Sequence, residues 1–293
     1  MEQQARTLQP GQTAQLFTYD LATGTSTLVT ESSAVLFEAP NWSVDGDWLI
    51  VNGDGVLQRV PADGGDLEPI EVPGLPLLNN DHVLSPDGSF AYVSGFDGHL
   101  HQVDLEARTS LRVSNDRGPA FVHFLHGVSP DGALLAYIGM DLLPDGGFRT
   151  NVYTVPTAGG PDHQLTDDAF PDDGSEFSPD GTLVFFNSER ASTIPGHAQL
   201  FRMQRDGSGV EQLTHDERVN WFPHISPDGS RIVYLSFPPG TVGHPADRDV
   251  IVRLLEDGAS RDLVGLFGGQ GTINVPSWAP DGKRFAYVAD PVP

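Results

Sequence analysis

One short turn occurs six times along the chain, and this repeat restricts the fold more than any other feature. The copies are Ser43–Gly46, Ser85–Gly88, Ser129–Gly132, Ser178–Gly181, Ser226–Gly229 and Ala279–Gly282. Their glycines lie 42, 44, 49, 48 and 53 residues apart, the length of one four-stranded blade of a β-propeller. Most copies read Ser-Pro-Asp-Gly, although the first has Val44 in place of Pro and the last has Ala279 in place of Ser. Pro fixes φ where it is present, Asp bonds nearby backbone and Gly accepts a positive φ, so each copy is predicted to reverse the chain.

The two ends of the chain each carry half of a repeat. Residues 15–30 contain only the outer strand pair, and residues 276–290 contain only the inner pair. We expect these halves to pair in one blade, which would remove the free sheet edges. The prediction is an all-β, six-bladed propeller in a single domain of residues 1–293. Its predicted blades are 41–73, 82–114, 126–167, 175–215, 223–265, and 276–290 with 15–30.

The amino-acid composition disfavours several classes of binding partner and metal site. Forty acidic and sixteen basic residues give a net charge of -24, which disfavours nucleic acid and anionic membrane surfaces. The chain has no cysteine, so disulfides and thiolate metal sites are excluded. Residues 1–15 lack the features of a secretory signal, and no apolar run is long enough to span a membrane. We therefore expect a cytoplasmic location and no membrane insertion. The oligomeric state stays open.

The repeats resemble the propeller of TolB over residues 15–289. Several segments are similar to stand-alone bacterial TolB-like propellers: 79–82, 126–129, 173–178, 221–224 and 268–272. TolB itself is periplasmic and has an additional N-terminal domain. From this sequence we expect neither a secretory signal nor that additional domain. A more distant resemblance is to oligogalacturonate lyases, which implies related propellers that hold a metal through His and Gln side chains in the channel.

Residues just before each turn are expected to converge on one rim of the channel, because the first strand of a blade lines it. His82 and His126 stand three residues before their Ser, and His224 stands two before. Together they are candidate ligands of a divalent metal, Mn, Zn or Fe. The alternative is that they bond the backbone of the rim loops. His123 and His244 are interpreted as structural.

Further candidates lie on the same rim. Glu176 and Asp173 are candidate catalytic residues, because a desolvated carboxylate can serve as general base or acid. The alternative, which is the commoner role of such residues, is that they cap loops through backbone amides. Trp221 could stack on a sugar ring or wedge between blades. The predicted ligand-binding residues are Asn80, Asp81, Trp221, Gln270, Asn274 and Arg190.

Two functions follow from this rim. The first is a metal-dependent carbohydrate lyase or hydrolase that acts on an oligosaccharide. The second is a non-catalytic propeller, like that of TolB, whose rim binds a protein, a peptide or a small molecule.

Overall fold

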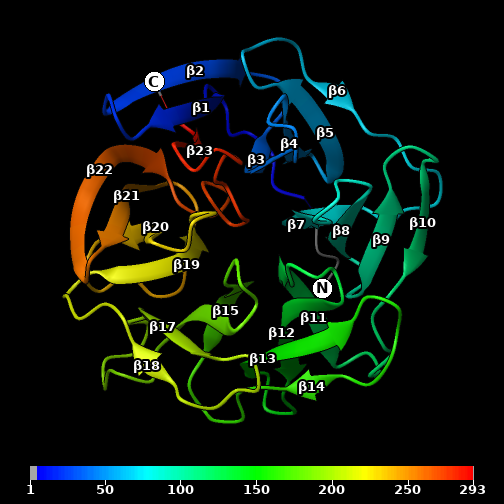
Figure 1. The fold of residues 1–293 in the computed structure, drawn as a ribbon, viewed down its shortest axis with the longest axis vertical. Helices are drawn as coiled ribbons and strands as arrows, with labels where there is room; N and C mark the ends of the chain where they lie inside the picture. The colour runs from blue at the N-terminus through cyan, green and yellow to red at the C-terminus, as the bar shows by residue number, and fades with distance from the viewer. Residues whose placement is uncertain (1–4, 293) are drawn as a thin grey trace.

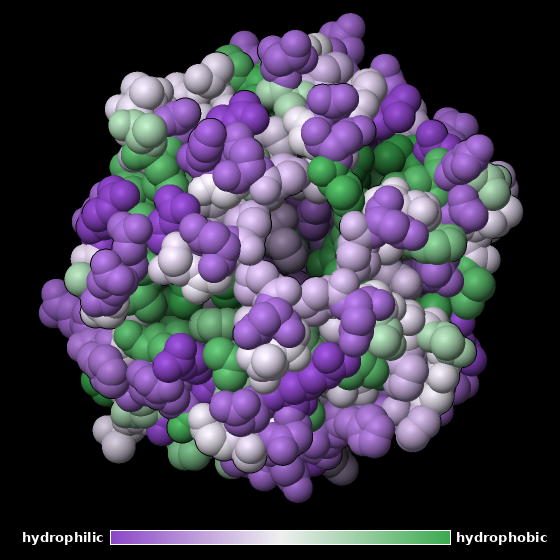
Figure 2. Space-filling model, in the orientation of Figure 1, coloured by the Kyte–Doolittle hydropathy of each residue, from purple (hydrophilic) through white to green (hydrophobic). Residues whose placement is uncertain are grey.

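The computed structural model describes residues 5–292, which form a six-bladed β-propeller (Figure 1). The blades are antiparallel sheets arranged around a central channel. No helix in residues 5–292 is long and apolar enough to cross a membrane. The channel opens as a hollow at the centre of the face shown in Figure 2. The predicted fold class is confirmed.

The strands follow one another from the channel outward in each of the first five blades. Blade 1 contains β3 (Phe37–Trp42), β4 (Trp48–Gly53), β5 (Val56–Pro61) and β6 (Glu68–Pro69). Blade 2 contains β7 (Leu78–Leu84), β8 (Phe90–Gly95), β9 (Leu100–Asp104) and β10 (Thr109–Arg112). Blade 3 contains β11 (Phe121–Val128), β12 (Leu134–Leu142), β13 (Phe148–Pro156) and β14 (His163–Gln164). Blade 4 contains β15 (Asp172–Phe177), β16 (Leu183–Ser188), β17 (Gln199–Gln204) and β18 (Glu211–Gln212). Blade 5 contains β19 (Val219–Ile225), β20 (Arg231–Phe237), β21 (Arg248–Glu256) and β22 (Ala259–Gly268).

Blade 6 closes the ring by joining the two ends of the chain. It contains β1 (Ala14–Asp20), β2 (Thr25–Ser32) and β23 (Arg284–Ala289) in the order β2-β1-β23. The β1 and β23 strands are antiparallel, with Gln15 opposite Ala289 and Asp20 opposite Arg284. An isolated bridge from Trp278 to Phe285 continues this sheet toward the channel. The predicted closure is therefore confirmed.

Each repeated turn is held by its own side chains, as the second copy illustrates. The Ser85 hydroxyl donates to Asp87 Oδ1 at 2.6 Å and accepts from the Phe90 amide at 2.9 Å. Gly88 takes a φ of +74°, which favours glycine. The motif thus serves the scaffold by linking the first and second strands of a blade.

A bulge interrupts the innermost strand of blades 1, 4 and 5 at the same place. The register shifts between Glu38 and Asn41 in β3, between Asp173 and Glu176 in β15, and between Trp221 and His224 in β19. In each bulge one residue is left-handed, with φ of +56° at Ala39, +65° at Gly174 and +55° at Phe222.

The innermost strands also start earlier than the blade boundaries expected from the sequence. In blades 1 to 5 they begin at Phe37, Leu78, Phe121, Asp172 and Val219, three to five residues before the expected starts. The stretches expected to be loops entering the blades are therefore part of the innermost strands that line the channel.

Candidate functional site

A cavity of about 520 Å³ lies at the mouth of the channel. Every blade contributes to its wall the residue five positions before its repeated turn. These six residues are Glu38, Asn80, Phe124, Asp173, Trp221 and Asn274. The propeller symmetry thus brings one equivalent position from each blade to a single site.

Blade 3 supplies an apolar side of this cavity. Phe124 comes from β11, Ile138 and Met140 from β12, and Phe148 from the start of β13. Phe148 is 61% exposed, although large apolar side chains are normally buried. This side of the cavity can therefore accept an apolar group and is partly open to solvent.

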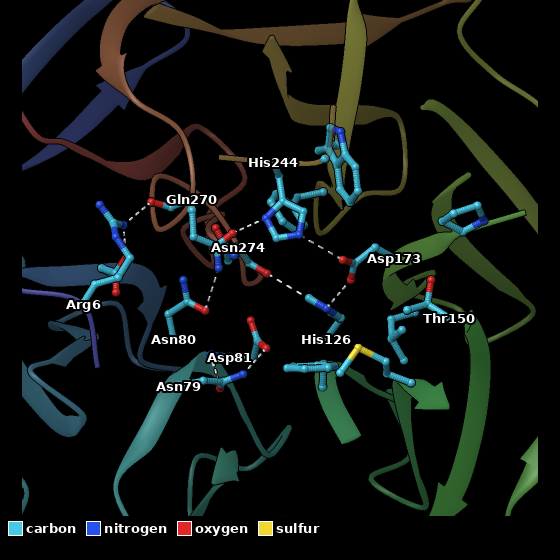
Figure 3. A pocket seen from close by; sticks show the side chains of 18 of the residues that line it. Arg6, Asn79, Asn80, Asp81, His126, Thr150, Asp173, His244, Gln270 and Asn274 are labelled. Carbon is cyan, nitrogen blue, oxygen red and sulfur yellow. Dashed lines mark hydrogen bonds and ion pairs between the residues drawn. The ribbon is translucent and has the colours of Figure 1, made fainter. Parts of the chain in front are cut away.

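A continuous chain of polar contacts follows another part of the wall (Figure 3). The Gln270 amide donates to Asn80 Oδ1 at 3.3 Å, and Gln270 Oε1 accepts from His244 Nδ1. The Asp173 carboxylate lies between two rings, with Oδ2 at 3.4 Å from His244 Nε2 and Oδ1 at 2.8 Å from His126 Nε2. His126 Nδ1 reaches the carbonyl of Asn274 at 3.3 Å. Because both partners of the His126 ring are acceptors, its two nitrogens both donate and the ring is an imidazolium.

The ionisation of this group follows from its burial and its neighbours. Burial favours a neutral His126, but the carboxylates of Asp81 and Asp173 outweigh burial and raise its pKa to about 9. Burial would raise the pKa of Asp173, yet His126 and His244 hold it well below its usual range. Asp173 is therefore a fixed anion between two rings, and it cannot donate a proton near neutral pH.

Asp81 differs from Asp173 in having no ion-pair partner within residues 5–292. It is 4% exposed, and its Oδ2 accepts from the Asn79 side chain at 2.7 Å. Burial raises the pKa of Asp81 to about 6, although His126 acts in the opposite direction. Above that pH Asp81 adds a second carboxylate charge, beside Asp173, to the cavity wall around the His126 imidazolium.

The three predicted metal ligands do not meet at one point. The His82 ring is buried behind the wall, with Nε2 at 3.3 Å from the Ile50 carbonyl, and burial lowers its pKa to about 4. His224 bonds Glu176 through Nδ1 and the Ile273 carbonyl through Nε2. Of the three, only His126 lines the cavity. Among the described residues, no three His, Cys, Asp or Glu side chains are arranged to hold a metal ion.

The two candidate catalytic carboxylates also face different surroundings. Asp173 lines the cavity, whereas Glu176 does not. Glu176 lies beyond the bulge of β15 and accepts from His224 Nδ1 at 2.7 Å and from the Ile225 amide at 3.1 Å. Both of its oxygens are thereby used to join blades 4 and 5. Only Asp173 of this pair therefore faces the cavity.

The predicted ligand-binding residues separate into two groups. Cavity-lining residues are Asn80, Asp81, Trp221, Gln270 and Asn274. Arg190 instead lies behind the wall, where it pairs with Asp172 at 3.0 Å and Asp168 at 3.2 Å. Trp221 is 5% exposed and packs on the His244 ring at 4.5 Å between centroids, so little of its face is left for a sugar.

Some cavity residues were not among those named from the sequence as functional. His244, interpreted as structural, lies in the polar chain, and Arg6 and Glu38 line the wall together. Glu38 could have been found, because it stands five residues before its turn, as Asp173 does. His244 lies in the loop between β20 and β21, and Arg6 precedes β1, so no repeat spacing identifies either residue.

Comparisons with known proteins agree with the architecture. The family profile of the TolB beta propeller domain matches residues 63–288. The uncharacterized protein Atu1656 of Agrobacterium fabrum is 38% identical over 261 residues, which cover 86% of this chain and 84% of that protein. The structure of a candidate TolB from Agrobacterium tumefaciens has a TM-score of 0.86 and 34% identity, covering 96% of this chain and 99% of that chain.

A lower similarity links the chain to an oligogalacturonate lyase solved in complex with manganese. The TM-score is 0.59 at 17% identity, over 87% of this chain and 74% of the lyase, and this similarity concerns the fold alone. The profile and the 38% identical relative together cover most of the propeller. The chain therefore belongs to the TolB β-propeller domain family.

Proposed function

We propose that this propeller is a binding protein whose channel-mouth cavity takes an amphipathic, positively charged ligand, such as an arylalkylamine or the free amino terminus of an apolar peptide. The carboxylate of Asp81 carries the proposal, because it is buried in the wall, faces the cavity and lacks an ion-pair partner within residues 5–292. A buried anion of this kind gains most from a ligand that brings the opposite charge.

The rest of the cavity suits the same ligand. The apolar side chains of blade 3 can cover a hydrocarbon or aromatic group while its charged end reaches Asp81. The net charge of -24 adds a long-range attraction for cations. A volume of about 520 Å³ is within the range of pockets that bind small molecules.

Metal-dependent carbohydrate chemistry has less support from these contacts. His82 and His224 have their reachable ring nitrogens directed at backbone carbonyls or at Glu176, and Trp221 is covered by His244. Stoichiometric Mn, Zn or Fe in the purified protein, lost in a His126→Ala variant, would favour that alternative over the binding function.

Calorimetric titration with matched probes tests the proposal. The probes are 2-phenylethylamine, 2-phenylethanol and phenylacetate, together with Ala-Phe-Phe-amide and its N-acetylated form. At pH 8 we expect the amine and the free peptide to bind about tenfold or more tightly than their neutral counterparts, since a charged hydrogen bond contributes about 1.5–3 kcal/mol. Phenylacetate should bind least.

Asp81→Asn is the decisive variant because it keeps the shape and removes the charge. It should abolish the preference for the cationic probes, whereas Asp54→Asn, which removes an exposed charge outside the cavity wall, should preserve it. The preference should also weaken below pH 6, where Asp81 binds a proton. Equal binding of charged and neutral probes, or no binding of any probe, would refute the proposed function.

A further inference from the structure

The segment before β1 places one arginine at the cavity mouth. Arg6 contacts the Glu38 carboxylate through Nη1 and donates from the same nitrogen to the Gln270 carbonyl at 2.6 Å. Its Nη2 lies 3.7 Å from Asp290 Oδ2 and 4.0 Å from Asp247 Oδ1. One guanidinium thus faces three carboxylates and a carbonyl, which come from blade 1, blade 6 and the loop before β21. Figure 3 shows Arg6 beside Gln270, across the site from Thr150.

Two of these carboxylates are buried, and their ionised forms are favoured by a nearby cation. Asp290 is 1% exposed, and neither of its oxygens has a hydrogen-bond donor within residues 5–292. Glu38 is 7% exposed and lies in the cavity wall. Burial raises the pKa of Asp290 to about 7 and also raises that of Glu38, although Arg6 opposes both changes. At 3.7 Å from Arg6 Nη2, Asp290 Oδ2 is too far away to accept a hydrogen bond from it.

The arginine is carried by a segment that belongs to no sheet, residues 5–12. The Gln9 and Gln12 amides each lie 2.7 Å from the Asp247 carboxylate, Gln12 also donates to the Asp290 carbonyl at 3.0 Å, and Leu8 packs against the core. The Arg6 side chain is 27% exposed, in contrast to the buried acids around it. The guanidinium is therefore reachable from solvent, whereas the acids that receive it belong to the rigid propeller.

We propose that Glu38, Asp290, Asp247 and the Gln270 carbonyl form a guanidinium-binding site, which Arg6 fills from within the chain and which an arginine side chain of a peptide or a small guanidinium compound can take in its place. A planar guanidinium has five donors in a fixed fork, and the site offers acceptors on several sides. An internal occupant acts at an effective concentration in the millimolar range for a short tether, so an external group must exceed that to displace it. This site lies in the wall of the same cavity as Asp81 but uses different residues, and it does not depend on the function proposed above.

Chemical complementation of an Arg6→Ala variant tests the site. Thermal unfolding is followed with methylguanidinium chloride from 1 to 20 mM, and with equal concentrations of methylammonium chloride and sodium chloride. We expect methylguanidinium to raise the melting temperature of the variant in a saturable way, with at least tenfold higher apparent affinity than methylammonium. The wild-type protein should respond less than the variant, and only at the higher concentrations, because Arg6 competes for the site.

Two further variants localise the effect. Arg59→Ala removes an arginine from the exposed pair with Glu68 and should show no methylguanidinium rescue. Arg6→Ala combined with Asp290→Asn should lose the rescue, because a buried member of the site is gone. If Arg6→Ala does not fold alone, it should refold in methylguanidinium and not in sodium chloride. Absence of rescue, or equal rescue in the Arg59→Ala variant, would overturn the proposal whether or not amines bind at Asp81.

Discussion

Replacing Asp173 by Asn removes the charge that lies between His126 and His244. The substitution keeps an acceptor for His126 Nε2, which lies 2.8 Å from Asp173 Oδ1, so the shape of the wall should be maintained. Asp173 and Asp81 together raise the pKa of His126 from 6.5 to about 9. That difference corresponds to about 3 kcal/mol of preference for the imidazolium, shared between the two carboxylates.

The sign of the pH dependence follows from this raised pKa. The contribution of a group whose pKa is higher in the folded state is complete below about pH 6.5 and disappears as the pH rises through about 9. The wild-type free energy of unfolding should therefore decrease over this range. In Asp173→Asn the His126 pKa should fall by about one pH unit or more, and the decrease should be correspondingly smaller. At neutral pH the free energy of unfolding of the variant should be about 2 kcal/mol lower than that of the wild type. This loss is smaller than for a fully unpaired buried charge, because Asp81 still stabilises the His126 imidazolium.

Urea unfolding at pH 6, 7.5 and 9, combined with NMR titration of the histidine ring protons, measures both effects. Asp97→Asn is the matched control, because Asp97 pairs with His101 at 3.0 Å but is 37% exposed. The control should lose less than about 0.5 kcal/mol. If Asp173→Asn retains the wild-type pH dependence and an unchanged His126 titration, the assignment of Asp173 as the anion that holds His126 charged is refuted.

Two other substitutions test the wall of the cavity. Gly174→Ala should destabilise the protein by about 2 kcal/mol or more, since φ is +65° and the new Cβ would lie 2.7 Å from Asn187 Oδ1. The control is Gly240→Ala, where φ is +80° but no atom lies near the new Cβ, and it should cost about 1 kcal/mol in the same urea assay. Arg190→Ala should cost about 3 kcal/mol at pH 8, because it leaves the buried Asp172 carboxylate without its partner, and the deficit should shrink below pH 6, where Asp172 takes up a proton. A deficit for Arg190→Ala that is equal at pH 5 and pH 8 would contradict this explanation.

The architecture was predictable because its determinants are local and repeated. The turn residues carry their own hydrogen bonds, so each copy marks the same point of a blade wherever it occurs. The half repeats at residues 15–30 and 276–290 likewise predicted the pairing of β1 with β23. The starts of the innermost strands were predicted late, because the residues before each turn continue a bulged strand along the channel. Only one of the three shared bulges has a glycine, at Gly174, so composition does not reveal them.

The site was predictable in part, for a related reason. Sequence spacing indicated the rim on which this cavity lies, and most of the residues named as ligand-binding line the cavity. For metal ligands, however, it favoured the positions two and three residues before the turn, where His82, His126 and His224 lie, and of these only His126 lines the cavity. The position five residues before the turn lines the cavity in every blade. Which of the positions nearer the turn faces the channel depends on where a bulge shifts the alternation of side chains along the innermost strand. The place of the bulge is set by the pairing of that strand with the next one. Contributions from loops, such as His244, have no repeat to identify them.

His82 and His126 show how strongly a bulge decides orientation. Both stand three residues before the Ser of their turn, so blade symmetry predicts the same environment for both. In β7 the irregularity lies between Leu78 and His82, and His82 is back in the ladder opposite Val93. In β11 it lies between Leu125 and Gly127, and His126 is itself the extra residue, with its ring turned toward Asp173. Blades 1, 4 and 5 share one bulge, and there the equivalent residues Glu38, Asp173 and Trp221 all line the cavity. The position five residues before the turn therefore faces the cavity in every blade, whereas the orientation at the position three residues before it depends on the bulge, so metal ligands inferred at that position across blades with different bulges should be expected to point apart.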